Sequence, residues 1–400
     1  MTAVPQMCPF DLTGRSVHED ADRLRERGPA VRVDLSGGVT AWSVTRYDVV
    51  KSLAADPRAS RDARQHWPHL AAVPADWPLA PFLIAPTVLN AYGPDHTRLR
   101  TIMEAAFTPQ RTQALETRLR ERLRHLLDEL TEAGDLVDLR DRYASVVACE
   151  TLSDLFGVAP SAWPEMTKVI GRLLAPSDDP EEASAGLGEV MEFLGALIAA
   201  KRDTPGDDLA TTLAEAAELT EEERVLALAV TIAGGVPSTT GLITNAIFAL
   251  ATHPDQLAGV LKGRTRWDDV LDETLRADSP VQHMPLRYAV EDIDLGEGVF
   301  IRRGEAILLG FGAVGRDPRV HSEAPGTFDA RRPAKDHLAF GHGVHRCIAG
   351  ALGLAEATVA VSALFERFPD LALAEPADRL DPLPTIVFSG KARLPVRLNP

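Results

Sequence analysis

The fold is decided by the stretch Phe340-Gly341-His342-Gly343-Val344-His345-Arg346-Cys347-Ile348-Ala349-Gly350. Residues 351–360 follow it and are predicted to be helical, so Cys347 lies near a helix N-terminus, where the macrodipole and free backbone N–H groups stabilise a thiolate. Gly341 and Gly343 permit backbone conformations that other residues avoid, and they allow close approach to a flat group. Phe340 is an apolar cover. The stretch therefore presents a shielded thiolate of the kind that binds a metal.

Three interpretations of Cys347 compete. It could be a buried structural cysteine, the usual role of a lone cysteine. It could be a nucleophile, but a cysteine phosphatase needs an arginine shortly after the thiolate, and the next one is Arg367; no cysteine-protease signature surrounds it. It could bind a metal. His342, His345 and Cys347 supply three zinc ligands, although structural zinc usually needs a fourth ligand and close cysteine pairs. A haem iron with one axial thiolate needs Cys347 alone.

The spacing Phe340-x-x-Gly343-x-His345-x-Cys347 resembles the haem-binding loop of the cytochrome P-450 family. The resemblance implies haem b as cofactor, with Cys347 as the iron ligand and a catalytic residue. It also implies that Phe340 lies at the haem and that His345 bonds a propionate. The implied fold is mainly α with a smaller β region, the cytochrome P-450 fold. One departure is Ala349, which stands where the family usually has glycine.

Composition is that of a globular protein with an acidic surface. The 400 residues are 45% hydrophobic and 25% charged, with a net charge of −16, which argues against nucleic acid or an anionic membrane as partner. Cys8, Cys149 and Cys347 are far apart and odd in number, as expected in a reducing cytoplasm. The N-terminus has neither a basic n-region nor an apolar h-region, so no signal peptide is expected, and no run of about 18 apolar residues predicts a membrane span. We therefore expect a cytoplasmic protein without a membrane anchor, similar to the soluble bacterial members of the family.

A single domain over residues 1–400 is expected. Helices are predicted at 17–27 and 47–56, and period-two alternation at 30–35 and 39–44 predicts a hairpin. Residues 57–93 form a long irregular stretch, and such stretches are often functional. The helix-rich core is placed at about 94–280 and 347–367, and the β-rich parts at about 30–45, 284–309 and 383–398, the last as a closing hairpin.

Three further cationic positions match the family's haem-propionate residues. His96 and Arg100 are four residues apart and share one face of a predicted helix, so they can clamp a carboxylate. Arg287 precedes the small sheet of the 284–309 region. The resemblance implies that all three bind haem propionates.

A long apolar helix is predicted over residues 219–252, with the sequence Ala233-Gly234-Gly235-Val236-Pro237-Ser238-Thr239-Thr240 inside it. A proline in mid-helix removes a hydrogen bond and clashes one turn back, at a cost of about 3 kcal/mol or more, so we expect a break that opens space for a small ligand. The alternative is two helices joined by a kink. The family carries an acid followed by an alcohol here.

Aligned without gaps, Pro237 takes the position of the acid and Ser238 that of the alcohol; a register one residue later places Ser238 and Thr239 there. Either way the carboxylate is missing, and Ser238 and Thr239 are the candidate catalytic residues beside Cys347. The same departure is similar to that of bacterial members acting on cyclic dipeptides. The resemblance also implies substrate-pocket residues, which are Val88, Leu89, Asn90, Gly234, Ser238, Ile386 and Val387.

Glu273-Thr274-Leu275-Arg276 resembles the family's Glu-x-x-Arg helix, whose two charged residues join a later arginine to lock the fold. Glu273 and Arg276 lie one helical turn apart and share a face. The candidate third member is Arg331. Gly315 stands where the family usually has asparagine.

The function implied is reductive activation of O2 for oxidation of a small-molecule natural product of secondary metabolism, with oxidative C–C or C–N coupling of an aromatic cyclic dipeptide as one form. The alternatives are hydroxylation or epoxidation of a macrolide or terpenoid, and a non-catalytic haem- or ligand-binding protein. The implied partners are a ferredoxin and an NAD(P)H-dependent ferredoxin reductase. Basic residues near the haem loop are candidates to receive the ferredoxin: Arg331, Arg332, Lys335 and Arg346.

Overall fold

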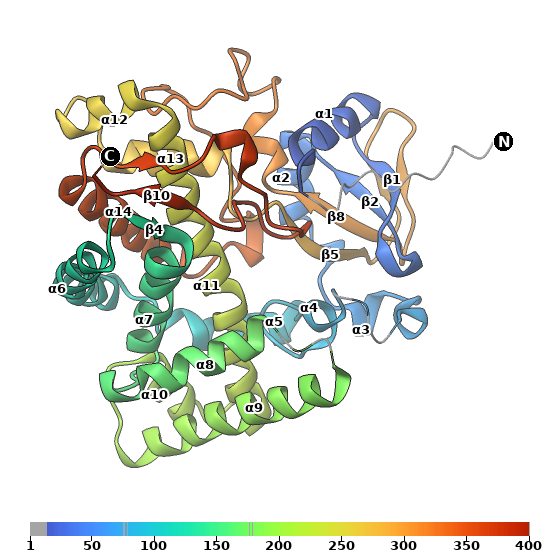
Figure 1. Ribbon diagram of the computed structural model, residues 1–400. Coiled ribbons are helices and arrows are strands. Elements are labelled where there is room, and N and C mark those ends of the chain that lie inside the picture. The colour runs from blue at the N-terminus through green and yellow to red at the C-terminus, as the bar shows by residue number, and fades with distance from the viewer. Residues whose placement is uncertain (1–13, 75–76, 78, 176, 178, 400) are drawn as a thin grey trace.

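The computed structural model describes residues 14–74, 77, 79–175, 177 and 179–399, so Cys8 lies outside the described residues. Helices form most of the chain between 93 and 277 and again after the haem loop (Figure 1). The helices of the first part are α1 (Val17–Arg27), α2 (Tyr47–Ala55), α3 (Ala63–His66), α4 (Ala80–Ile84), α5 (Gly93–Glu104) and α6 (Pro109–Ala133). The later helices are α7 (Ser145–Leu155), α8 (Trp163–Leu174), α9 (Pro180–Asp203), α10 (Leu209–Glu215), α11 (Glu221–Thr252), α12 (Pro254–Leu261), α13 (Trp267–Ala277) and α14 (Gly350–Arg367).

Most of the smaller β region lies on the right in Figure 1, beside α1 and α2, whereas β4 and β10 lie on the left among the helices. Its main sheet has the order β1-β2-β8-β5-β3, in which β2 and β8 are parallel and the other pairs are antiparallel. The hairpin predicted at 30–35 and 39–44 is confirmed, with Val31 opposite Ser43 and Asp34 opposite Thr40. The strands are β1 (Val31–Asp34), β2 (Thr40–Val44), β3 (Ala59–Ser60), β4 (Leu136–Asp138), β5 (His283–Ala289), β6 (Ile293–Asp294), β7 (Phe300–Ile301), β8 (Ala306–Gly310), β9 (Ala372–Leu373) and β10 (Pro395–Arg397).

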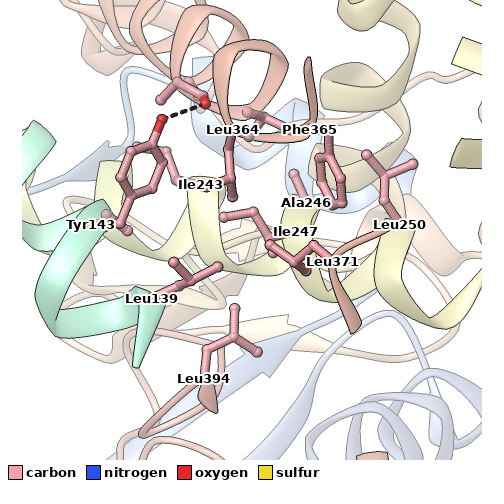
Figure 2. Close-up of a cluster of buried hydrophobic side chains, with 14 of the residues drawn as sticks. Leu139, Tyr143, Ile243, Ala246, Ile247, Leu250, Leu364, Phe365, Leu371 and Leu394 are labelled. Atoms are coloured by element: carbon pink, nitrogen blue, oxygen red, sulfur yellow. Dashed lines mark hydrogen bonds between the residues drawn. The ribbon is translucent and has the colours of Figure 1, made fainter. Parts of the chain in front are cut away.

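The largest hydrophobic core lies where α11, α14 and the segment around Tyr143 meet (Figure 2). Ile243 and Ile247 of α11 are fully buried against Leu364 and Phe365 of α14. The Tyr143 hydroxyl donates to the Ala360 carbonyl at 2.7 Å, so the one polar group of this buried ring is satisfied. This core holds the two helices that flank the site in a fixed relation.

The predicted break in α11 is wrong. The helix is continuous from Glu221 to Thr252 and contains Pro237 without interruption. The Ser238 hydroxyl donates to the Gly234 carbonyl at 2.6 Å and lies 3.1 Å from the Gly235 carbonyl. This contact does not replace the hydrogen bond that Pro237 lacks, since it goes to other carbonyls; the cores on both sides of the helix supply packing that outweighs the local cost of proline.

The predicted closing hairpin at 383–398 is only partly present. An isolated antiparallel bridge joins Pro382 to Lys391, and the Leu383 N–H donates to the Gly390 carbonyl at 2.9 Å. Pro384 has no backbone N–H to donate to a ladder, which disfavours a longer strand pair here. β10, at the end of the region, pairs with β4 and β9 instead.

Two helices are long and apolar enough to cross a membrane by length and composition alone, one within α9 and the other α11. Half of the most apolar window of α11 is buried (50%), against 17% for α9. A core helix passes the same test as a membrane span, and α11 runs through the middle of the helices (Figure 1). The absence of a membrane anchor remains a prediction.

Candidate active site

The haem-loop sequence folds as a tight turn before α14. The Cys347 N–H donates to the Phe340 carbonyl at 2.8 Å and closes the loop. Gly343 has φ +72°, and a Cβ there would lie 2.6 Å from the Ala54 carbonyl oxygen of α2. The close backbone approach that requires glycine at 343 is therefore to the end of α2 and not, as expected, to a flat group.

Cys347 is accessible to solvent, although the surrounding protein raises the pKa of its thiol by burial. The Ala349 N–H, Arg100 and Arg346 partly offset that rise. α14 begins at Gly350 with Ala349 as its N-cap, so Cys347 precedes the helix and gains only part of the expected thiolate stabilisation. Because the Cys347 sulfur is surrounded by protein and is still accessible, it faces a space inside the protein. A metal cation bound there would displace the thiol proton.

Gly350 lies against the apolar cover of the loop. A Cβ at Gly350 would lie 3.4 Å from the Phe340 ring, which is a tight but not a forbidden contact. The side chain of Phe340 is partly buried against the main core. This contact places the ring over the start of α14, beside Cys347.

Four cationic or titratable side chains meet next to the loop. Arg61 and Arg287 are 3% exposed and His96 is 5% exposed. The rings of His96 and His345 lie 4.2 Å apart, centroid to centroid. The structure thus brings together three of the predicted propionate residues and adds Arg61, from the segment between β3 and α3.

The two arginines carry positive charge that the protein does not neutralise. Burial lowers the pKa of Arg61 to about 10, and burial together with the Arg61 charge lowers the pKa of Arg287 to about 9. Both guanidinium groups are nevertheless cationic near neutral pH. Burial, then the nearby arginines, lowers the pKa of His345 far below its usual range. No carboxylate of a described residue is among the causes acting on the two arginines.

This arrangement fits haem b. Two buried guanidinium groups present two charges, and haem b carries two propionates. The Nε2 atom of His96 is buried without a hydrogen-bond partner among the described residues, and a carboxylate would satisfy it. Arg100 contributes less, because it already contacts Glu104 at 2.6 Å and the Arg346 carbonyl at 2.8 Å.

Arg61 is the residue that sequence reasoning missed. Its Nε donates to the Leu89 carbonyl at 2.6 Å, and its Nη2 donates to the Pro285 carbonyl at 2.8 Å. Arg61 thereby ties the predicted substrate loop to β5. No local pattern distinguishes it from the other 41 of the 42 basic residues, so only the fold reveals it.

The proposed pocket residues differ in environment. Val88 and Leu89 are partly buried and Asn90 is buried, while Gly234 is exposed although α11 is central. A Cβ at Gly234 would meet nothing within 4 Å, so space opens there. Ile386 and Val387 behave differently: Ile386 is partly buried, and Val387 is 3% exposed within the N-terminal core.

Ser238 and Thr239 contact different elements. Ser238 bonds within its own helix, as described above. A Cβ at Gly353 of α14 would lie 4.0 Å from the Thr239 Oγ1, so Thr239 faces α14. The sequence alone could not show that these two neighbouring side chains contact different elements.

The Glu273–Arg276 pair is fully buried and doubly bonded. Its two N···O distances are both 2.7 Å. Arg276 also donates to the carbonyls of Gly315, Pro325 and Thr327 at 2.7 to 2.9 Å. A Cβ at Gly315 would lie 2.1 Å from the Arg276 carbonyl, which explains why asparagine cannot stand there.

The third member of this lock is Arg332, and the prediction of Arg331 is wrong. Arg332 Nε lies 3.4 Å from Glu273 Oε1, whereas the Arg331 side chain is 66% exposed and contacts Asp329. Lys335 contacts Asp269 at 3.0 Å and is mostly buried. Of the four candidate ferredoxin-binding residues, Arg332 and Lys335 are therefore engaged inside the protein. The described residues contain no group of three His, Cys, Asp or Glu side chains placed to hold a metal, which leaves the zinc interpretation without support.

Comparison with known proteins agrees with this geometry. A sequence profile described as cytochrome P450 matches residues 266–390. The chain is 37% identical to 2-hydroxy-5-methyl-1-naphthoate 7-hydroxylase of Streptomyces carzinostaticus over 98% of both chains. It is 33% identical to 6-deoxyerythronolide B hydroxylase of Saccharopolyspora erythraea over the full length of both. The solved structure of CYP154A1 from Streptomyces coelicolor is similar, with a TM-score of 0.90, 41% identity, and coverage of 98% of this chain and 100% of that one.

Proposed function

The chain belongs to the cytochrome P450 family, and we propose that it hydroxylates a small-molecule natural product that carries a polycyclic or macrocyclic carbon skeleton. It is a haem-thiolate oxidoreductase with haem b as cofactor, and its fold is the predicted one. The proposed substrate class rests on relatives named as a naphthoate hydroxylase and as a hydroxylase of 6-deoxyerythronolide B.

The single observation that carries this proposal is the accessible Cys347 two residues from His345, which lies near the uncompensated pair Arg61 and Arg287. Bound haem b supplies reductive activation of O2. Cys347 would supply the thiolate ligand, and Arg61, Arg287, His96 and His345 would hold the propionates.

On the distal side, the Ser238 hydroxyl keeps its proton directed at the Gly234 carbonyl. Its oxygen lone pairs therefore remain available to accept a hydrogen bond. A Cβ at Gly234 would meet nothing within 4 Å, so the helix leaves room there for the substrate and O2. The loop at Val88–Asn90 and the segment at Ile386 line the substrate side, with Arg61 holding the loop by the Leu89 carbonyl.

A second candidate function is oxidative coupling of an aromatic cyclic dipeptide. The observation that favours it is Pro237, which replaces the carboxylate expected in the distal helix. A substrate with its own acidic phenol or indole hydrogen would need no dedicated acid. We propose a cytoplasmic location, with electrons from NAD(P)H through a ferredoxin reductase and a ferredoxin that approaches the exposed Arg331 and Arg346.

The first experiment is the carbon monoxide difference spectrum of the reduced holoprotein. A red-shifted, thiolate-type Soret band that is lost in Cys347→Ser and retained in Cys149→Ala supports the proposal. Cys149 is a matched control because it is a second described cysteine, buried in the core. A histidine-type band in folded wild-type protein contradicts it. Turnover of any substrate with a complete redox chain excludes the alternative of a non-catalytic haem protein.

The substrate class is tested by spin-state titration. Hydroxynaphthoates, macrolactones and aromatic cyclic dipeptides are added separately to the oxidised holoprotein. A shift with either of the first two supports hydroxylation, provided that a hydroxylated product forms. A shift only with the cyclic dipeptides, with a coupled product, favours the second function.

A further inference from the structure

The loop of residues 85–91 contains the predicted pocket residues 88–90, and we call it the substrate loop. Hydrogen bonds inside this loop form one compact turn. The Asn90 N–H donates to the Thr87 carbonyl at 3.0 Å, and the Asn90 Nδ2 atom donates to the Ala85 carbonyl at 3.1 Å. Because these bonds join residues of the loop to one another, they fix its shape and leave its place in the molecule to other contacts.

Arg61 anchors the substrate loop to the β region. Its Nε atom donates to the Leu89 carbonyl at 2.6 Å, and its Nη2 atom donates to the Pro285 carbonyl of β5 at 2.8 Å. Among the described residues, Arg61 is the one side chain from outside the loop that hydrogen-bonds to it. The side chain is 3% exposed, so water does not readily replace it as the donor to these carbonyls. The position of the loop therefore depends on the position of the guanidinium group.

The third nitrogen of the same guanidinium group remains for an anion. An arginine side chain has five N–H donors, and the two carbonyls use two of them. The Nη1 atom of Arg61 has no hydrogen-bond partner among the described residues. After burial, the charge of Arg61 is the next cause that lowers the pKa of both Arg287 and His345, so this charge lies among the side chains that fit haem propionates. Arg61 therefore borders the haem site on one side and the substrate loop on the other.

We propose that Arg61 is a positioning residue that couples the haem site to the substrate loop. Its Nη1 atom donates to a haem propionate, while its Nε atom holds the Leu89 carbonyl and thereby the loop. The inference rests on the proposed function, since it names the residue that sets the place of the loop beside the bound haem. The planar fork of an arginine presents donors in fixed directions, so one guanidinium group serves the propionate and both carbonyls together.

Arg287 provides a matched comparison for Arg61. It is equally buried, at 3% exposed, and no carboxylate of a described residue acts on its charge. Its Nη1 atom donates to the Ala59 carbonyl of β3 at 3.1 Å, and no hydrogen bond joins it to the described part of the substrate loop. A change at Arg287 should therefore weaken haem binding and leave the loop in place, whereas a change at Arg61 should release the loop.

The test measures amide hydrogen exchange of residues 87–91 in holoprotein that carries one haem per chain. In Arg61→Met we expect these amides to exchange at least fivefold faster than in wild type, with the thiolate-type carbon monoxide spectrum retained. In Arg287→Gln they should exchange within twofold of wild type. Amides of α7 report any general loosening and should be unchanged in both variants. Wild-type protection of the loop in Arg61→Met overturns the proposal, and so does equal loosening of the loop in Arg287→Gln.

A second readout compares two ligands of the oxidised haem iron. 4-Phenylimidazole extends its phenyl group toward the substrate side, whereas cyanide is too small to reach the loop. In Arg61→Met we expect the dissociation constant of 4-phenylimidazole to rise at least threefold relative to that of cyanide, and in Arg287→Gln we expect the ratio of the two constants to stay at the wild-type value. A wild-type ratio in Arg61→Met overturns the proposal.

Failure of this inference is distinguishable from failure of the proposed function. A wild-type protein without the thiolate-type carbon monoxide spectrum contradicts the proposed function, whatever the loop does. If Arg61→Met does not fold or does not bind haem, Arg61→Lys decides by the same two measurements, because it keeps the charge and offers one nitrogen in place of the fork. Faster exchange of the loop in Arg61→Lys supports the proposal, and wild-type exchange overturns it.

Discussion

The protein buries arginines in two places with opposite consequences. Arg276 is fully buried and doubly bonded to Glu273, so its charge is neutralised by a residue one helical turn away. Arg61 and Arg287 are also buried, yet their protein partners are backbone carbonyls, and the charge of Arg61 acts against that of Arg287. A buried charge with an opposite charge beside it stabilises one arrangement of the chain. Two buried like charges without a carboxylate partner mark the place of an anionic ligand.

The largest expected effect comes from breaking the paired site. Arg276→Met leaves the buried Glu273 carboxylate with only its longer contact to Arg332 and frees three carbonyls, which should lower the free energy of unfolding by about 3–5 kcal/mol. Urea unfolding followed by circular dichroism measures this. The double variant Glu273→Gln/Arg276→Met removes both charges and should recover part of the loss. A single variant as stable as wild type would contradict the role of the lock.

The unpaired site should respond in the opposite way. Arg287→Gln removes one of two like charges, so the haem-free protein should be as stable as wild type or more stable. Haem should dissociate at least about tenfold faster, which corresponds to about 1.4 kcal/mol of lost binding. Haem transfer to excess apomyoglobin measures the rate, and thermal unfolding of the haem-free protein is the control. Destabilisation of the haem-free protein with unchanged haem retention would reverse the assignment.

Glu356 is a third kind of buried ionisable group, beside the paired Arg276 and the unpaired Arg61 and Arg287, because it is neutral when protonated. Its pKa of about 8 in the folded protein, raised by burial, exceeds the ordinary value of 4.5, so the folded state binds a proton that the unfolded state releases between these values. Stability due to this group is therefore present below pH 4.5 and is lost as pH rises toward 8. The unfolding free energy of wild type minus that of Glu356→Gln should fall by about 1.4 kcal/mol per pH unit in this window and then level off. A difference independent of pH would mean that the carboxyl is charged in the fold.

The smallest expected effect is the difference in stability between variants of Arg331 and Arg332, the two neighbouring arginines near the Glu273–Arg276 pair. Arg332→Ala removes a mostly buried side chain that contacts Glu273 and donates to the Glu323, Ala324 and Thr327 carbonyls, and should cost about 1–2 kcal/mol. Arg331→Ala removes an exposed side chain and should change stability by less than about 0.5 kcal/mol. Chemical unfolding of both variants in one buffer measures the difference. A larger loss in Arg331→Ala would restore the sequence-based assignment.

Sequence reasoning failed where long-range packing decides. Pro237 predicts a broken helix on local grounds, but the packed cores on both sides of α11 keep the helix continuous. Arg331 and Arg332 are adjacent and chemically equal. Which of them joins the Glu273–Arg276 pair depends on which side chain the loop turns toward Glu273. Gly343 adopts the left-handed conformation predicted for it, with φ +72°, but the close approach that it permits is to α2 and not to a flat group.

The sequence by itself determined the lone Cys347 in its loop, the amphipathic helices and the Glu273–Arg276 pair, because each depends on spacing within a few turns of chain. It also determined that no carboxylate stands at the usual position of the distal helix. Only the tertiary structure decided that Arg61 joins Arg287 and that Glu356 is buried. It also decided that Thr239 faces α14, whereas Ser238 bonds within its own helix. The physical reason is that burial and charge compensation are set by neighbours far away in the sequence, which no local pattern records.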